Sequence, residues 1–398
     1  MHEPAIDKQQ LPPRDLAWPF WFVLPLYPHG RRQTLRQEIQ KDTLWTFDQL
    51  LGLLYVVVPI RMTVVKLSGG GLLVYAPIAP TGECIRLVRE LEAQYGQVKY
   101  IILPTTSGLE HKVFVGPFAR FFPKADVFVA PDQWSFPIHL PLSWLGLPIG
   151  RTHILPKESR KAPFADDFDY AILERIYLGL GSFSEVAFYH KASNSLLVTD
   201  IVLSVPEEPP EIVQLDPYPL LFHAKDHALS PIEDTAKNRQ KGWQRIVLFM
   251  FFFQPSRLDV STLRQSFQEA RKARNASPTP YFGLFPFNWR PDWQSSFATL
   301  SNNQALRVAP ILQLLILNRA PQETRNWVDK ISRWNFKQII PCHFDAPIQA
   351  GSEQFRQAFA FLEEGHPRDY CEHDLHLLHK IDRILTRLRL IPASKIKR

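Results

Sequence analysis

Three short apolar segments of this chain are each followed by residues that can bind a metal ion. The pairs are residues 98–103 with Glu110 and His111, residues 196–199 with Asp200, and residues 339–341 with His343. In layered α/β folds the ends of such strands meet at one edge of a sheet, and ligands bind there. We therefore expect the four side chains to lie close together, although they are far apart in the sequence. Carboxylate and imidazole groups suit one Zn, Fe or Mn ion.

The first half of the chain alternates between predicted strands and helices. β-Branched segments at 61–67 and 72–76 flank a glycine-rich turn, which indicates a β-hairpin. Apolar residues at helical spacing predict a helix over 82–95. The further predicted elements are a strand at 98–103, a helix at 112–122, a strand at 125–130, and strands at 170–178, 185–190 and 195–200. This alternation is typical of sheets and helices packed in layers.

The second half is rich in helical patterns and in proline. The chain has 35 prolines among 398 residues. They predict stiff loops between short elements, because proline fixes φ and lacks a backbone donor. We interpret residues 215–335 as a helical insertion. Helices are predicted at 238–253, 260–274, 304–318, 321–334, 352–363 and 373–390, with a short strand at 337–341.

Charge and cysteine content exclude some partners and compartments. The 46 lysines and arginines against 39 acidic residues give a formal net charge of +7. The sequence has neither an aromatic-and-basic RNA motif nor a basic recognition helix, so we expect no nucleic acid partner. Its 3 cysteines have no paired spacing, which suits a reducing compartment and not a disulfide framework.

Residues 16–32 form an aromatic segment with two arginines at its end. The segment contains Trp18 and Trp21 before Arg31 and Arg32, and it is too short to span a bilayer. One interpretation is an arm that packs against the main body. The other is peripheral membrane contact, in which the aromatic rings lie at the interface beside basic residues.

The order of the elements and polar residues resembles the metallo-β-lactamase fold. More closely, the chain is similar to a family of cyanobacteria and chloroplasts, without an established activity, that is related to that fold. The segments that carry the likeness are RMTVVKL (61–67), LVYAP (73–77), YIILP (100–104), GLEHK (108–112), LVTD (197–200) and IPCH (340–343). The resemblance implies an α/β protein with an αββα sandwich and a location in the cytoplasm or chloroplast stroma. The implied parts are an N-terminal arm (1–45), a metallo-β-lactamase-like domain (46–365) that holds the insertion, and a C-terminal helical tail (366–398).

The same resemblance implies an incomplete metal motif. Active relatives carry His-x-His-x-Asp-His after the strand, whereas this chain has Thr106 and Gly108 at the first two histidine positions. Residues 178–182 lack the third histidine, so the first of two metal sites is lost. Glu replaces Asp in the second site, which keeps a carboxylate. The second site corresponds to Glu110, His111, Asp200 and His343.

Half of a metal motif is compatible with two functions. The first is a degenerate, non-catalytic scaffold or ligand-binding protein for a small molecule or a protein partner. The second is a mononuclear metal-dependent hydrolase, which would use a metal-bound water on an ester, thioester, amide or phosphoester. Such a hydrolase would lack the clamping of substrate between two ions.

Three other groups of polar residues are alternative candidates for a functional site. They are a loop with two histidines and an aspartate, three histidines at helical spacing, and the residue types of a catalytic triad without a nucleophile elbow. We interpret the loop as a hydrogen-bonding element and the three histidines as a polar flank beside a packing stripe. The groups are residues 222–227, His373 with His376 and His379, and His190 with Ser195 and Asp200.

Overall fold

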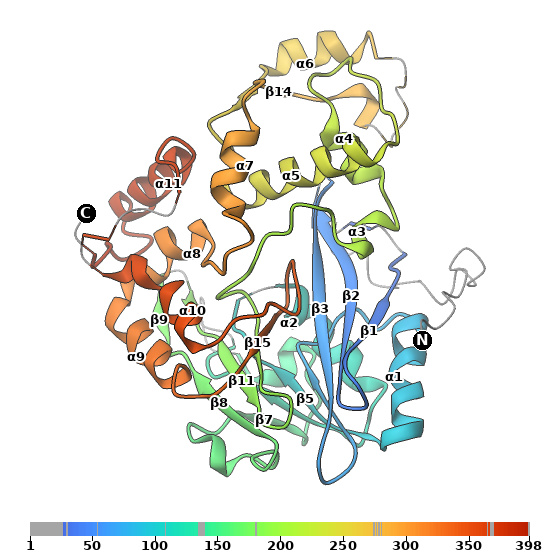
Figure 1. Cartoon of the computed structure of the whole chain (residues 1–398), viewed down its shortest axis with the longest axis vertical. Helices are drawn as coiled ribbons and strands as arrows, with labels where there is room; N and C mark the ends of the chain where they lie inside the picture. The colour runs from blue at the N-terminus through green and yellow to red at the C-terminus, as the bar shows by residue number, and fades with distance from the viewer. Residues whose placement is uncertain are drawn as a thin grey trace.

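Two β-sheets lie face to face, with helices on both outer faces (Figure 1). The structure is a computed structural model. It describes residues 27–28, 31–53, 55–107, 109–133, 140–179, 181–273, 275, 277, 279, 281–363, 365–366 and 370–396.

The first sheet has seven strands in the order of the sequence. Neighbours from β1 to β4 are antiparallel, and neighbours from β4 to β7 are parallel. The pairing of β3 with β4 confirms the predicted hairpin. The strands are β1 (Leu35–Gln40), β2 (Leu44–Leu53), β3 (Val56–Lys66), β4 (Leu72–Tyr75), β5 (Val98–Leu103), β6 (Asp126–Val129) and β7 (Thr152–Ile154).

The second sheet has four strands in the order β15–β12–β11–β8. Its strands β12 and β15 are parallel, with Val198 opposite Pro341, so the two strands end at the same edge. The strands are β8 (Phe168–Ile172), β11 (Val186–His190), β12 (Ser195–Val198) and β15 (Gln338–Pro341), and a separate short pair is β9 (Ile176–Tyr177) with β10 (Ser182–Phe183).

Alternation of side chains along the strands builds the layers. In β4, Tyr75 belongs to the apolar core between the sheets, whereas Val74 packs in the core with α1 (Gly82–Tyr95) and α2 (Leu109–Arg120). In β12, Leu197 points into the core between the sheets and its neighbours point to the opposite face. Each sheet therefore buries both faces.

Helices α9 (Pro321–Ile331) and α10 (Ser352–Gln357) cover the outer face of the second sheet. Trp327 of α9 donates from Nε1 to the carbonyl oxygen of Ala171 on β8 at 3.0 Å. Phe355 of α10 packs on that indole with ring centroids 6.1 Å apart. The order helix, sheet, sheet, helix confirms the αββα sandwich expected from the sequence.

The regular elements between β12 and β15 are mostly helices, as the sequence predicts. Most of it lies at the upper end of the molecule in Figure 1, beyond the sandwich, whereas α8 and α9 lie beside the second sheet. The helices and strands there are α3 (Glu211–Gln214), α4 (Tyr218–Ala224), α5 (Ala236–Phe252), β13 (Leu258–Val260), α6 (Leu263–Ala270), β14 (Phe287–Trp289), α7 (Gln294–Ser301) and α8 (Pro310–Leu315). After β15, α11 (His376–Arg387) follows α10, and 3₁₀ turns lie at Leu142–Leu145, Ser159–Lys161, Tyr281–Gly283, Leu317–Arg319 and Ala360–Leu362.

Several elements differ from the sequence-based prediction. The predicted helix at 260–274 is strand β13 followed by the shorter α6, and the predicted helix at 304–318 is reduced to α8. Strands β1 and β2 had not been predicted, because Asp48 and Gln49 interrupt the apolar pattern of β2. Asp48 pairs with Arg61 of β3, and Gln49 bonds to the backbone of Ala79, so both polar groups are satisfied inside the sheet. Part of the predicted arm at 35–45 is therefore in the first sheet. Helix α2 also differs, because it begins at Leu109 instead of 112.

Much of the aromatic segment at 16–32 lies outside the described residues. The structure describes Tyr27, Pro28, Arg31 and Arg32 of it. Arg32 is buried and donates from Nη1 to the carbonyl oxygen of Leu50 at 2.9 Å. Within the described ranges, no helix has the length and apolar character that crossing a bilayer requires.

We expect Gly242→Ala to destabilise the protein. Gly242 lies on α5 against α4, and a Cβ there would be 1.8 Å from the carbonyl oxygen of Leu220. Helices must separate to admit the methyl group, so the free energy of unfolding should fall by about 2–3 kcal/mol in a urea titration. Gly69→Ala is the matched control, because nothing lies within 4 Å of its added Cβ. Equal stability of the two variants would contradict this packing.

We also expect His190 to weaken the fold in acid. Burial lowers the pKa of His190 to about 4, against the smaller opposite effect of Asp167, and Nδ1 lies 2.7 Å from Ser193 Oγ. The neutral form stabilises the folded state above about pH 6.5, and this stability is lost as the pH falls towards 4, by up to about 3 kcal/mol. Urea unfolding at several pH values should show a shallower acid limb for His190→Gln than for the wild type. Parallel limbs would contradict the assignment.

Candidate metal centre

The ends of four elements bring Glu110, His111, Asp200 and His343 to one edge of the sandwich. Glu110 and His111 occupy the first turn of α2, which follows β5. Asp200 follows β12, and His343 follows β15. Because β12 and β15 are parallel and in register, their last residues emerge side by side. The early start of α2, missed from the sequence, sets the direction of the first two side chains.

Three of these side chains converge on one point. One ligand atom each of Glu110, His111 and His343 lies within 4.8 Å of the other two. His343 Nε2 lies 3.3 Å from Glu110 Oε1 and 2.9 Å from Asp200 Oδ1. Asp200 therefore joins the group through His343. Among the described residues, this is the one set of three or more metal-ligand side chains at such spacing.

Both histidines are oriented by backbone carbonyl groups. His111 Nδ1 lies 3.1 Å from the carbonyl oxygen of Pro77, and His343 Nδ1 lies 3.0 Å from that of Pro59. A carbonyl oxygen only accepts, so each Nδ1 must carry the proton. Metal-binding histidines commonly have their second nitrogen held this way. The Nε2 of His111 is buried and has no hydrogen-bond partner among the described residues.

Charge and burial act against each other in the cluster. Burial disfavours the charged form of Glu110, but the hydrogen bond and charge of His343 outweigh it and lower the Glu110 pKa to about 2. Burial also disfavours a charged His343, yet Asp200 and Glu110 raise its pKa to about 10. Burial lowers the pKa of His111, which is consistent with a neutral imidazole. The cluster thus presents two carboxyl side chains, one neutral imidazole and one imidazolium that carries a proton on both nitrogens.

Glu185 is a neighbour of this site that the sequence reasoning missed. It is buried directly before β11, and its two oxygens accept from the backbone N–H of Thr199 at 2.7 Å and of Asp200 at 3.0 Å. Burial and the charge of Asp200 raise the Glu185 pKa to about 7. Glu185 fixes the turn that presents Asp200. In the sequence, Glu185 could have been noticed only as an acidic residue next to apolar strand residues.

Arg61 positions the opposite side of the cluster and was also missed. Its Nη1 donates to the carbonyl oxygen of Pro341 at 2.9 Å, and its Nη2 donates to that of Phe344 at 3.0 Å. Arg61 thereby binds the backbone on both sides of His343. Cys342 lies in the same segment, and burial raises the pKa of its thiol well above the ordinary value, so it is not a thiolate.

Thr106, which stands at one of the two expected histidine positions, takes part in a hydrogen-bonded contact between the loops that follow β5 and β10. Thr106 Oγ1 accepts from the backbone N–H of Ser184 at 2.9 Å, and the N–H of Thr106 donates to the carbonyl oxygen of Ser184 at 3.0 Å. Gly108 and Leu180 lie outside the described residues. The donor set therefore fits one ion in the second site, with nitrogen and oxygen ligands suited to Zn, Fe or Mn.

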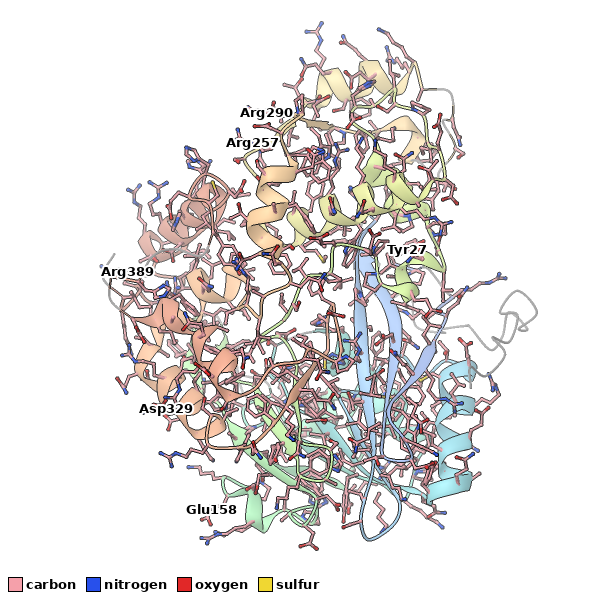
Figure 2. The ribbon with its side chains drawn as sticks, in the orientation of Figure 1. Tyr27, Glu158, Arg257, Arg290, Asp329 and Arg389 are labelled. Carbon is pink, nitrogen blue, oxygen red and sulfur yellow. The ribbon has the colours of Figure 1, made fainter. Side chains whose placement is uncertain are left out.

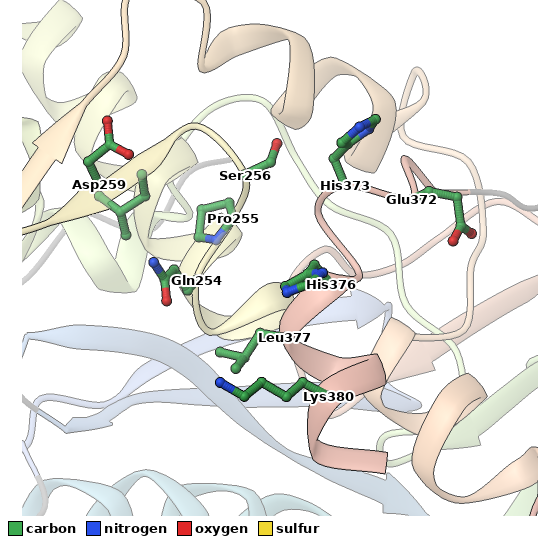
Figure 3. A pocket seen from close by; sticks show the side chains of 10 residues that line it. Gln254, Pro255, Ser256, Asp259, Glu372, His373, His376, Leu377 and Lys380 are labelled. Atoms are coloured by element: carbon green, nitrogen blue, oxygen red, sulfur yellow. The ribbon is translucent and has the colours of Figure 1, made fainter. Parts of the chain in front are cut away.

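The three histidines near the C-terminus do not form a comparable cluster. His373 and His376 line an open pocket of about 540 Å³ between the start of α11 and residues 254–259 (Figure 3). Cys371 Sγ is 4.0 Å from His373 Nδ1, and His379 pairs with Glu372 at 3.7 Å. No set of three close ligand atoms occurs among the described residues there.

The other two alternatives have structural partners. In the loop at 222–227, Asp226 pairs with Arg245 at 2.6 Å and with Lys241 at 2.8 Å. In the triad-like group, His190 Nδ1 contacts Ser193 Oγ, and Ser193 donates to Ser195 Oγ at 2.8 Å. Those groups lie at the hairpin between β11 and β12, at the opposite end of β12 from Asp200.

Comparison with solved structures finds low sequence identity. The metallo-β-lactamase DIM-1 is 9% identical, with a TM-score of 0.41, over 83% of this chain and 98% of that chain. A fragment of diflavin flavoprotein A 5 from Nostoc sp. PCC 7120 is 11% identical, with a TM-score of 0.40, over 84% and 96%. A metallo-β-lactamase from Pontibacter korlensis is 10% identical, with a TM-score of 0.36, over 82% and 99%.

Sequence comparison places the chain in a family. A search of curated proteins finds no match. The family model described as "Domain of unknown function (DUF4336)" matches residues 41–361. Since the match covers most of the 398 residues, this protein belongs to the DUF4336 family.

Proposed function

We propose that this protein binds one divalent ion, Zn, Fe or Mn, and acts as a mononuclear metal-dependent hydrolase. The ligands would be Glu110, His111, Asp200 and His343. The observation that carries the proposal is the orientation of the two imidazoles. Carbonyl groups hold both Nδ1 atoms, so both Nε2 atoms face the carboxylates, and that of His111 has no partner among the described residues.

Each residue of the cluster has a separate task in this proposal. His111 is fully buried and would anchor the ion from the protein side. The Asp200 side chain is 22% exposed and that of Glu110 is 16% exposed, so solvent and substrate would approach from the carboxylate side. Glu185 and Arg61 keep Asp200 and His343 in place through backbone contacts. A bound ion would lower the pKa of a coordinated water towards neutrality.

The substrate class follows from a single ion. One ion supplies an activated water and polarises one oxygen, which suits an ester, thioester, amide or phosphoester. We place the protein in the cytoplasm or chloroplast stroma on its family resemblance.

A specific contact also favours the second candidate, a non-catalytic scaffold or ligand-binding protein. His343 bonds to both carboxylates, and this ion triad satisfies three of the four side chains. In that case the cluster would stabilise the sandwich edge without an ion. Metal content distinguishes the two functions.

We expect about one ion per chain in protein that is purified without chelator or affinity metal and then offered Zn, Fe or Mn. The double variant His111→Ala/His343→Ala should lose it, because both imidazole ligands are removed. Elemental analysis measures the ratio. The matched control is His373→Ala/His376→Ala, which removes two histidines from the pocket in Figure 3 and should keep the ion. No ion in the wild type, with an unchanged melting temperature after metal addition, would favour the scaffold.

We further expect Glu185→Gln to weaken metal binding by about 10–100-fold, although Glu185 would not touch the ion. The amide loses one of the two oxygens that accept from Thr199 and Asp200, so Asp200 is held less firmly. Competition with a coloured chelator measures the affinity. Glu158→Gln serves as the control, because Glu158 is a surface carboxylate paired with Arg160 and Lys161. Equal affinities in both variants would refute this role of Glu185.

A further inference from the structure

Helix α6 (Leu263–Ala270) turns apolar side chains towards solvent. Leu263 is 80% exposed and Phe267, one turn later, is 57% exposed. The buried residue of the helix is Ser266. A helix on a globular protein normally does the reverse and buries its apolar stripe. Thr262 and Gln265 form a capping box at its start, so the helix presents these side chains from a fixed backbone.

Further exposed apolar residues lie next to this helix. Val260 precedes it at the end of β13 and is 51% exposed, and Phe282 of the neighbouring 3₁₀ turn is 61% exposed. That turn packs against α6. The helix lies at the upper tip of the molecule, remote from the sandwich (Figure 1). Single exposed apolar residues are common, whereas a group of four on one tip marks an interaction surface.

The exposed charged residues of α6 and of the turn after it are basic, whereas the acidic Glu269 of α6 is partly buried. Arg264, Arg271 and Lys272 are exposed, and none forms an ion pair among the described residues. Two other arginines of this end, Arg257 and Arg290 in Figure 2, are paired with acidic residues, Asp292 at 3.2 Å and Asp259 at 2.8 Å. The three unpaired cationic side chains therefore make the surface around α6 positively charged.

We propose that this tip docks on an anionic membrane surface. The docking face consists of Leu263, Phe267, Phe282, Arg264, Arg271 and Lys272. Apolar side chains beside basic ones on a short ordered helix suit the boundary between lipid headgroups and acyl chains. There the apolar side chains contact the acyl chains and the basic side chains contact the headgroups. The positive charge matches acidic headgroups, which attract basic residues close to the surface. The contact is peripheral and is independent of a metal in the candidate centre.

The test is co-sedimentation of the full chain with vesicles. We expect binding to phosphatidylcholine vesicles that contain about 30% phosphatidylserine, and much weaker binding to phosphatidylcholine alone. Leu263→Ser/Phe267→Ser should lower the partition coefficient at least about tenfold. Arg264→Gln/Arg271→Gln/Lys272→Gln should lower it by about fivefold per removed charge and abolish its dependence on salt.

The matched control removes an equally exposed apolar pair elsewhere. Trp144 and Ile149 are 74% and 86% exposed near β7, so Trp144→Ser/Ile149→Ser should bind like the wild type. All four positions are at the surface, and equal melting temperatures confirm that each variant folds.

Three outcomes would overturn the proposal: no binding by the wild type, full binding by both α6 variants, or loss of binding in the control. Retention by the α6 variants with loss on deleting residues 1–33 would assign the contact to the N-terminal segment instead. Capture of a protein by the tip without vesicle binding would assign it to a protein partner.

Discussion

The buried guanidinium of Arg61 connects the two sheets at the candidate metal centre. It belongs to β3 of the first sheet, pairs with Asp48 of β2 at 2.8 Å, and donates to carbonyl groups on the segment that follows β15 of the second sheet. A buried charge that loses its partner typically costs about 3–5 kcal/mol. The Arg61 contacts therefore fix one arrangement of the sheets. Since the two acceptors, Pro341 and Phe344, flank His343, the position of that imidazole follows from the same contacts.

Strand β3 also determines which nitrogen His343 presents. Pro59, two residues before Arg61, accepts the Nδ1 proton, so Nε2 faces Glu110 and Asp200. Pro77, after β4, has the same role for His111. The hairpin β3–β4 thus orients both histidines without contributing a ligand. The candidate ligands come from the start of α2 and from the segments after β12 and β15, and the carbonyl groups of Pro59 and Pro77 select the tautomers of the two histidines.

The sequence predicted that the four candidate side chains lie close together, but it did not predict the groups that hold them in place. Apolar strands that end in Asp200 or Cys342-His343 are visible as local patterns, and sheet geometry brings their ends together. Glu185 and Arg61 are different, because Arg61 is a charged residue inside β3 and Glu185 is an acidic residue directly before β11. Their partners are backbone groups on other segments, 280 residues away for Arg61 and Pro341 and 14 residues away for Glu185 and Thr199, which no local pattern shows. The same limit explains β2, where Asp48 looks like a break until its pairing with Arg61 is known.

The helical region connects the tip of the molecule with the candidate centre through Phe344. This residue follows His343, and its φ of 60° lies in the left-handed region, which costs a non-glycine residue about 1–3 kcal/mol. Packing offsets that cost, because its ring meets Trp243 and Phe251 of α5 at centroid distances of 5.9 and 5.4 Å. The end of α5 leads directly into the hairpin that carries α6. A displacement of α5 would therefore move Phe344 and, with it, the imidazole of His343. The packing of α5 on Phe344 thus helps to set the position of His343, so the helical region contributes to the geometry of the candidate centre.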